Sequence, residues 1–230
     1  MITLLDREDL LFNPPESGCV LSLTGLPGGS NKIYDRSPYH DLGTITGASW
    51  LKLPNGLWCL SFDGVDDVVS FVANSSLDIV GDITILLWFN TGDNKSTQFP
   101  MGRGTTGAVG WRIELGNGTL FQFTVGNGTD LTADTKTSTM GVWNFGVCRR
   151  SGAEVEVFIN GVGSGSPGTL TGSIDYTGVG LAIGHRSIPV GNAARYFHGQ
   201  IALPRIYNRA LSALEIKNRF DQEKHLFGVW

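Results

Sequence analysis

The sequence has few of the features that mark several large classes of protein. No apolar run approaches the ~20 residues of a membrane-spanning helix, so membrane insertion is not expected. The segment from Met1 to Asn13 is interrupted by charges and lacks a signal-peptide apolar core. No export signal is therefore expected, and the localisation stays open. The net charge is −4, and nucleic acid is not an expected partner because its backbone needs a basic face.

Cysteine is also scarce, with three residues at Cys19, Cys59 and Cys148. An odd number of widely spaced cysteines, without an expected export signal, indicates reduced thiols. Each lies in or beside an apolar strand-like run, so we expect small buried hydrophobic residues. A Cys19–Cys59 bridge stays open as an alternative. No cysteine or histidine spacing resembles a zinc site.

Glycine, by contrast, is abundant, at 32 of 230 residues, where usage of about 7% is ordinary. The excess separates short apolar runs, which is typical of many strands joined by many turns. No repeat of solenoid or propeller period and no composition break occur. We therefore expect one all-β domain over residues 18–230. Residues 1–17 are predicted to form an N-terminal arm, either a short helix or a segment packed on its own domain or on a neighbouring copy.

The predicted strands are apolar or alternating runs bounded by turn signals, about a dozen in number at the spacing of sandwiches. They include residues 20–23, 48–53, 57–62, 83–89, 98–102, 110–115, 120–125, 143–148, 154–159, 180–184 and 196–207. Residues 83–89 form the most apolar run and are expected at the centre of a sheet. Asn117-Gly118 predicts a hairpin turn. Residues 33–45 and 163–172 are expected to be loops.

The last predicted strand, 196–207, carries apolar groups on both faces, so both faces are expected to be covered. Pro204 has no N–H for a ladder, which predicts a bulge or an edge there. Ser212 and Glu215 have the spacing of a capping box, so a helix should begin at Ser212. Leu214, Ile216 and Phe220 give this helix its apolar groups, and we expect it to act as a latch on the β structure.

Several motifs in this order carry a family resemblance over residues 20–220. They are Phe62-Asp-Gly-Val-Asp-Asp67, Ile83-Thr-Ile-Leu-Leu-Trp-Phe89, Val157-Phe-Ile-Asn-Gly161, Ala182-Ile-Gly184, Phe197-His-Gly-Gln-Ile201 and Arg205-Ile-Tyr-Asn-Arg-Ala-Leu-Ser212. The chain resembles the laminin G-like, concanavalin A-like jelly-roll family. The resemblance implies a sandwich of two antiparallel sheets with one short C-terminal helix. Members are mostly non-catalytic binding modules for glycans or proteins; some relatives are lectins, and others are glucanases or lyases.

The resemblance also bears on calcium. Some members hold a structural calcium near the Asp of an Asp-x-Ser loop and near an acidic pair on a late strand. Asp35-Arg-Ser37 matches the loop, but Ala202 and Leu203 stand where the acidic pair is usual. Calcium needs six to eight oxygens, so the loss of two carboxylates weakens this implication. Asp35 is the candidate metal ligand, and calcium is the one cofactor considered.

A saccharide site needs a flat aromatic face beside planar polar groups. Trp88 and Trp143 lie in apolar runs and are expected in the core. Two other segments offer aromatic rings beside cations, and either could equally be an interface or ordinary surface. The candidate ligand-binding residues in them are Arg103, Trp111, Arg112, His185, Arg186, Arg195 and Tyr196.

Catalysis is not expected. Asp63, Asp66 and Asp67 suit a tight turn whose carboxylates bond local amides. Glu154 and Glu156 share one strand face, as the acid pair of a glucanase does, but a solvated outer face explains them better. The hydroxyl residues lack a nucleophile elbow.

Three functions remain open. The first is a non-enzymatic module that recognises glycan or another surface ligand. The second is a structural subunit of an assembly, such as a virion decoration or fibre protein, which would form homo-oligomers or contact capsid or tail proteins. The predicted arm and the terminal Trp230 favour this one. The third and weakest is a glycoside hydrolase or lyase, which the missing acid pair disfavours.

Overall fold

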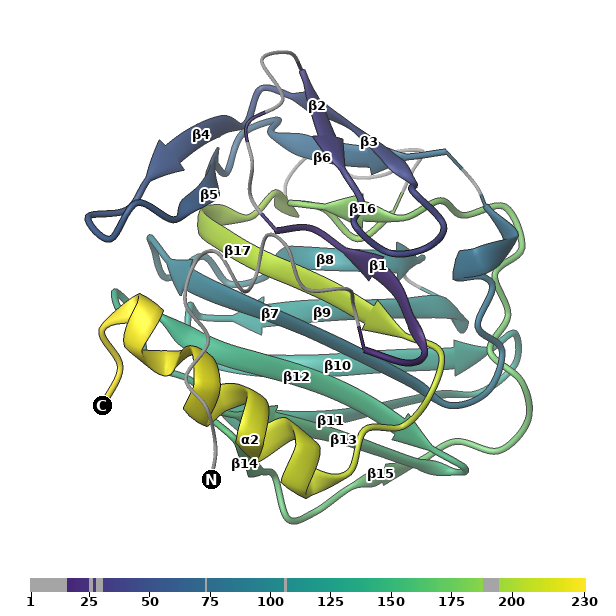
Figure 1. Ribbon diagram of the computed structural model, residues 1–230. Coiled ribbons are helices and arrows are strands. Elements are labelled where there is room, and N and C mark those ends of the chain that lie inside the picture. The colour runs from purple at the N-terminus through teal and green to yellow at the C-terminus, as the bar shows by residue number, and fades with distance from the viewer. Residues whose placement is uncertain (1–15, 25–26, 28–30, 73, 106, 188–194) are drawn as a thin grey trace.

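The computed structural model describes the chain except residues 1–15, 25–26, 28–30, 73, 106 and 188–194. Most of the predicted N-terminal arm therefore lies outside the described residues. The described chain forms a sandwich of two antiparallel sheets (Figure 1). One sheet has nine strands and the other has eight. Two antiparallel sheets and one short C-terminal helix confirm the predicted fold class.

The nine-stranded sheet, named sheet A here, holds the most apolar strand at its centre. Its main path is β14 (Val162–Gly163), β13 (Glu154–Ile159), β12 (Asn144–Ser151), β7 (Ile83–Thr91), β17 (His198–Tyr207), β5 (Trp58–Asp63) and β4 (Ser49–Lys52). In addition, β1 (Cys19–Ser22) pairs with β17, and β15 (Gly168–Thr169) pairs with β13. The central place predicted for residues 83–89 is confirmed.

The eight-stranded sheet is named sheet B. Its order is β11 (Leu131–Thr137), β10 (Leu120–Asn127), β9 (Val109–Gly116), β8 (Gln98–Gly104), β16 (Ala182–Ile183), β6 (Val68–Phe71), β3 (Leu42–Thr46) and β2 (Lys32–Tyr34). The hairpin predicted at Asn117-Gly118 joins β9 to β10, and both residues have positive φ, at 50° and 71°. Such a pair of left-handed residues matches the twist of the strands that it connects.

Two expectations about loops are wrong. Residues 32–34 and 42–46 form the paired strands β2 and β3 rather than a polar loop, and residues 168–169, within the expected loop 163–172, form β15. In addition, residues 131–137 form β11, which no pattern predicted. Strands β2, β3 and β11 lie at or next to an edge of sheet B. Edge strands have a solvated side and need little apolar character, so their sequences do not stand out.

Strand β7 is buried on both faces because the molecule has two apolar layers. Its side chains Ile85, Leu87 and Phe89 face the space between the sheets, where they join the main core. Leu86 and Trp88 face the other way and join a second cluster under the C-terminal helix. The predicted core position of Trp88 is confirmed, and Trp143 packs at the margin of this second cluster.

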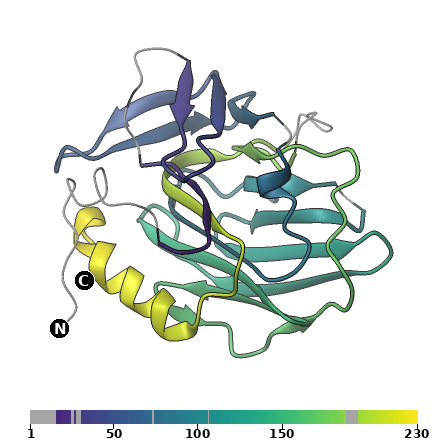
Figure 2. The ribbon, with the colours of Figure 1, turned by 45° about the vertical axis from the view of Figure 1, so that its right-hand side comes forward.

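Helix α2 (Ala213–Glu223) covers the outer face of sheet A, and Figure 2 shows it on that side of the sandwich. The predicted capping box is confirmed, because the Ser212 hydroxyl accepts from the Glu215 amide while the Glu215 carboxylate accepts from the Ser212 amide. Ile216 and Phe220 are buried against the sheet. The 3-10 helix η3 (Lys224–Phe227) follows and stacks Phe227 on Trp88, with ring centroids 4.2 Å apart.

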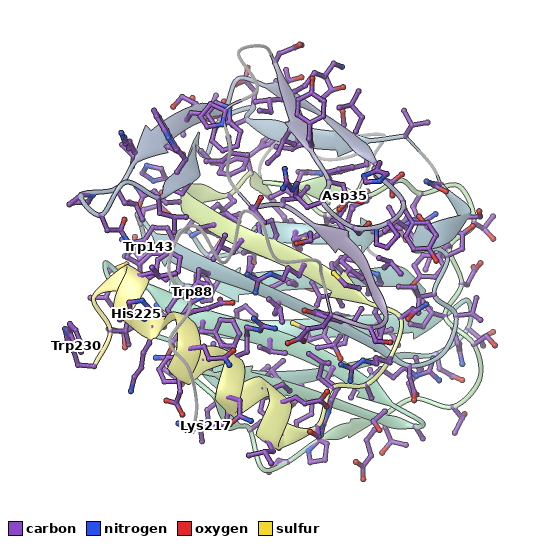
Figure 3. All side chains as sticks on the ribbon, in the orientation of Figure 1. Asp35, Trp88, Trp143, Lys217, His225 and Trp230 are labelled. Atoms are coloured by element: carbon purple, nitrogen blue, oxygen red, sulfur yellow. The ribbon has the colours of Figure 1, made fainter. Side chains whose placement is uncertain are left out.

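A buried ion pair fixes the end of α2 to the sheet. Glu223 is fully buried; it accepts from the Trp88 indole at 2.8 Å and pairs with Arg205 at 2.6 Å. Burial alone would lower the pKa of Arg205, but the Glu223 carboxylate raises it overall. Figure 3 shows Trp88, Trp143 and His225 close together at this end of the helix. The latch predicted from the sequence is therefore both apolar and ionic.

Smaller predictions are confirmed as well. The cysteines are unpaired and buried, and burial raises the pKa of Cys59 to about 12. The register of β17 against β7 shifts between Ala202 and Arg205, and Leu203 has a φ of 50°, so the chain bulges beside Pro204. Within the described residues, no helix is both long and apolar enough to cross a membrane.

Candidate functional site

The register of β8 against β9 divides the predicted ligand-binding residues between two places. Arg103 lies opposite Trp111, and Gly102 lies opposite Arg112. Because neighbouring residues of a strand point to opposite faces, the first pair faces the space between the sheets and the second faces outward. Trp111 is 1% exposed and belongs to the main core. The expectation that Trp111 offers an aromatic face to a ligand is therefore corrected.

Arg103 lies at the rim of the sandwich, where the core gives way to loops. Its side chain is almost fully buried, at 4% exposure. The guanidinium pairs with Asp78 at 2.5 Å and donates from Nε to the Val179 carbonyl at 3.1 Å. Its carbon Cζ lies 4.5 Å from the centre of the Tyr176 ring. Among the described residues, the buried Nη1 has no hydrogen-bond partner, which is costly for a charged donor.

An open pocket with a volume of about 640 Å³ adjoins Arg103. It is lined by residues between 71 and 80, by residues between 174 and 180, and by Arg103 itself. The first segment holds η1 (Ser75–Leu77), and both segments run along the right-hand side of Figure 1. The pocket is large enough for a small ligand, since binding sites of that kind measure about 300–1,000 Å³. We name it the rim pocket.

Tyr176 forms an aromatic wall of the rim pocket. Its ring is partly buried against the main core, and its hydroxyl donates to the Ile79 carbonyl at 2.9 Å. Burial raises the pKa of Tyr176, while the Arg103 cation and the Trp111 indole act in the opposite direction. The hydroxyl therefore stays protonated and keeps the ring fixed in one orientation.

Two acidic side chains complete the polar lining. Asp78 is paired with Arg103, as described above. Asp175 accepts from the amide and the hydroxyl of Thr177, and these hydrogen bonds lower its pKa. Both carboxylates therefore act as fixed hydrogen-bond acceptors. An aromatic ring, a cation and oriented acceptors around one pocket suit a ligand that has an apolar face and several hydroxyls.

Sequence reasoning missed most of this lining, because Tyr176, Asp78 and Asp175 lie in segments outside the predicted strands. The segment Ile174 to Gly180 had one usable signal, an Asp-Tyr-Thr-Gly sequence in which Asp175 bonds the residue two positions later. This pattern predicts an Asx turn. It says nothing of Arg103, which reaches the segment from β8.

The outward-facing candidates do come together. Phe99 of β8 lies within 5.6 Å of the Arg186 guanidinium and 6.0 Å of the Arg195 guanidinium, measured from ring centre to Cζ. It also contacts His185 edge-on, with ring centroids 6.2 Å apart. His185 in turn lies 4.9 Å from the Tyr196 ring. Ligand binding by these residues stays a prediction, and His185 and Tyr196 are buried.

The surroundings of Asp35 do not fit calcium. Asp35 is 4% exposed, and its carboxylate accepts from the amides of Ser22 and Ser37 and from the Ser37 hydroxyl, at 2.5–2.8 Å. A fourth donor, the Asp41 amide, lies at 3.2 Å. Asp35, labelled in Figure 3, directly follows β2 and bonds Ser22 at the end of β1, so it ties these segments together. Because protein donors use its lone pairs, the carboxylate has little capacity for a cation.

The remaining acids behave as structural groups. Asp63 accepts from the Val65 amide at 2.8 Å and Asp67 from the Asp63 amide at 2.7 Å, so the predicted turn is confirmed. With Asp66 they bring three carboxylates within 4.8 Å of one another. Glu156 pairs with Arg149 at 2.6 Å, and Glu154 is exposed. Neither Glu154 nor Glu156, both on β13, lines the rim pocket.

Solved structures with the same fold include binding domains of clostridial toxins. The binding domain of Paraclostridial Mosquitocidal Protein 1 matches with a TM-score of 0.71 and 16% identity, over 88% of this chain and 52% of that one. Botulinum neurotoxin type C matches with a TM-score of 0.69 and 15% identity, over 89% and 51%. The botulinum neurotoxin DC binding domain matches with 0.66 and 16% identity, over 89% and 51%. The chain thus spans about half the length of the structures that it matches.

No curated protein sequence matches this chain. A family profile does, however, and it covers residues 63–217. That range includes strands of both sheets, the bulge of β17 and the start of α2. The profile describes the laminin G type 3 family of the concanavalin A-like lectin/glucanases superfamily. The chain therefore belongs to this family.

Proposed function

We propose that the chain is a non-enzymatic binding module that takes a saccharide into the rim pocket. The observation that carries the proposal is the pairing of the Tyr176 ring with the nearly buried Arg103, whose Nη1 has no partner among the described residues. A sugar hydroxyl can accept a hydrogen bond from Nη1 of Arg103, while the apolar face of the sugar ring packs on the Tyr176 ring.

Proteins of the same fold support a saccharide as the ligand class. Cell entry of botulinum neurotoxin type C depends on interaction with two ganglioside molecules, and the binding domain of botulinum neurotoxin DC has been solved in complex with SialylT. The DC binding domain has also been solved with rat synaptotagmin II, so a protein surface is the alternative ligand. A saccharide fits the rim pocket better, because the pocket is concave and its polar groups converge on one small volume.

The acids of the rim pocket argue for binding without cleavage. A glycoside hydrolase needs one carboxyl group kept protonated by a raised pKa and a second one ionised. Asp175 has a lowered pKa through its Thr177 hydrogen bonds, and Asp78 is held by Arg103. The lowered pKa of Asp175 does not suit a proton donor, and Asp78 is engaged in its ion pair with Arg103. Incubation with a polysaccharide panel should therefore release no reducing ends, whereas steady release would contradict this part of the proposal.

Calorimetric titration with a panel of neutral and acidic oligosaccharides tests the proposal directly. We expect at least one oligosaccharide to bind. Tyr176→Leu should weaken its affinity about tenfold, or ~1.4 kcal/mol, because leucine keeps apolar bulk but lacks the aromatic ring. Asp175→Asn, which leaves the packing intact, should weaken it as well. Trp230→Ala is the matched control, since it removes an aromatic ring that is 92% exposed and far from the pocket in Figure 3. Equal affinity in all variants, or no binding at millimolar concentrations, would contradict the proposal.

A further inference from the structure

A cluster of cations on the outer face of sheet B carries an inference of its own. Gly102 and Arg112 lie opposite each other on β8 and β9 and point outward. The segment at Arg186 passes directly over Gly102, because a Cβ at Gly102 would lie 2.9 Å from the Arg186 Cα. The Gly104 amide donates to the Arg186 carbonyl at 3.1 Å and holds the segment there. This close approach, which glycine permits, brings Arg186 beside Arg112.

Arg186 is nearly buried but poorly partnered. Its exposure is 7%, and among the described residues its buried Nε and Nη1 have no hydrogen-bond partner. The guanidinium stands 5.6 Å from the centre of the Phe99 ring, and Arg195 lies on the same ring at 6.0 Å. A cation–π contact attracts the charge but leaves the N–H groups unused. A buried charged donor without a partner is costly, so these N–H groups are candidates to bind an acceptor.

The nearby acid does not supply that partner. Glu114 accepts from Arg112 Nε at 2.6 Å and from the Thr124 hydroxyl at 3.1 Å. Arg112 completes its own bonds by donating from Nη1 to the Thr105 carbonyl at 2.8 Å. Burial, followed by the charges of Arg112 and Arg195, lowers the pKa of Arg186, and Glu114 opposes this only in part. Arg186 therefore lies among the charges of Arg112 and Arg195, and the Glu114 carboxylate uses its Oε1 for Arg112 and Thr124.

We propose that Arg112, Arg186 and Arg195 form a binding site for an oxyanion, a sulfate or carboxylate group carried by an acidic saccharide. Guanidinium groups bind such anions through charge-assisted N–H bonds, and Arg186 has N–H groups without a described partner at Nε and Nη1. Arg195 is only partly buried, so the site can be reached from solvent on its side. The site is separate from the rim pocket, because Arg112 and Arg103 point to opposite faces of sheet B.

Thermal unfolding in sodium sulfate and in sodium chloride at equal ionic strength tests the oxyanion itself. We expect sulfate to raise the Tm of the wild type above the value in chloride, increasingly with concentration. Arg186→Met should abolish that difference. It should also leave the Tm in chloride unchanged or raise it, because the variant removes a buried cation between like charges. An arginine with a merely structural role would instead lower the Tm in chloride.

Lys52→Gln is the matched control, because it removes an exposed cation from β4 in the other sheet. It should keep the full sulfate response. The proposal is overturned if the wild type responds equally to sulfate and chloride, if Arg186→Met keeps the sulfate response, or if Arg186→Met lowers the Tm in chloride.

The saccharide part of the inference rests on the proposed function, while the sulfate experiment does not. Titrations with a sulfated disaccharide and with a uronic acid disaccharide distinguish the two sources of the oxyanion. We expect at least one of the two disaccharides to bind. Arg186→Met should weaken its affinity at least tenfold, whereas Tyr176→Leu should leave the affinity unchanged. Binding that depends on Tyr176 and ignores Arg186 would overturn this inference and leave the rim pocket standing. A sulfate response without binding of either disaccharide would overturn the saccharide part alone.

Discussion

Single polar side chains hold several segments of this sandwich together by accepting hydrogen bonds from more than one of them. Asp35 shows the pattern most clearly, because its buried carboxylate accepts from Ser22 on β1 and from Ser37 and Asp41 in the loop between β2 and β3. Asp93 does the same at the opposite rim with Lys95, Gln98 and His198. The acids of such sites are explained by the donors around them, and neither catalysis nor a metal ion is needed to account for them.

Asp35→Asn should lower the free energy of unfolding by about 2–3 kcal/mol, since an amide cannot accept from all of these buried donors. Urea unfolding measures the loss. Asp130→Asn, which changes an exposed turn carboxylate, is the matched control and should cost much less. The surroundings of Asp35 also predict that calcium and EDTA leave the Tm of the wild type unchanged. A clear rise in Tm with calcium would show that oxygens other than those around Asp35 bind it.

Asp93 should make stability depend on pH. Burial acts to raise its pKa, but the Lys95 amide and the hydrogen bond and charge of His198 lower it overall. A folded pKa below the unfolded value of about 3.9 means that Asp93 stabilises the fold above that pH and stops doing so as the pH falls through the folded pKa. Asp93→Asn should therefore cost roughly 1 kcal/mol at pH 7 and little at pH 2–3. An equal cost at both pH values, measured by urea unfolding, would contradict this assignment.

At the scale of elements, helix α2 is held by its apolar face and by one buried ion pair. Ile216 and Phe220 contact the outer cluster, which also contains Trp88 and Phe227. Glu223 then bonds both Trp88 and Arg205. Small changes in the apolar side chains should cost little stability. Loss of the Glu223 carboxylate should cost more, because Arg205 would then be buried without its partner.

Glu223→Ala should destabilise the fold by about 3–5 kcal/mol, since Arg205 then stays buried without its partner. The double variant Glu223→Leu with Arg205→Met should recover most of this loss, because it removes both charges and keeps the volume. Urea unfolding of the single and double variants gives the free energies of unfolding that this comparison needs. Similar losses in both would mean that packing at this point matters more than charge.

The elements differ in how well the sequence predicts them. Strand β7 and helix α2 are readable because an apolar run and a capping box leave strong local signals. Strands β3 and β11 are not, because they lie at or near the edge of sheet B and contain few large apolar residues. The bulge of β17 was readable from Pro204, since its missing N–H has a direct structural consequence.

The candidate sites were only half predictable, for a related reason. Arg103, Arg112 and Arg186 could be singled out from the sequence, but their directions depend on the register of β8 against β9. That register shifts between Gln98 and Met101, and no local pattern shows the shift. Tyr176 escaped notice because its neighbour Arg103 lies on β8, far away in the sequence. Such contacts are products of the whole fold.

At the scale of the whole molecule, the sandwich separates the side covered by helix α2 from the two proposed binding sites. Helix α2 covers the outer face of sheet A, as Figure 2 shows. The rim pocket lies between the sheets at one end, and the three arginines lie on the outer face of sheet B. A ligand at either proposed site would therefore leave the Glu223–Arg205 ion pair undisturbed.

Nuclear magnetic resonance of the labelled chain, during titration with the best-binding oligosaccharide of the panel, tests the rim pocket most directly. Saccharide binding there predicts that the amide signals of Thr177, Gly178 and Gly180 shift with the added ligand. Those of β4 should stay still, because that strand lies elsewhere, in sheet A. Saturable shifts confined to β4 or α2, with residues 174–180 unmoved, would contradict saccharide binding at the rim pocket.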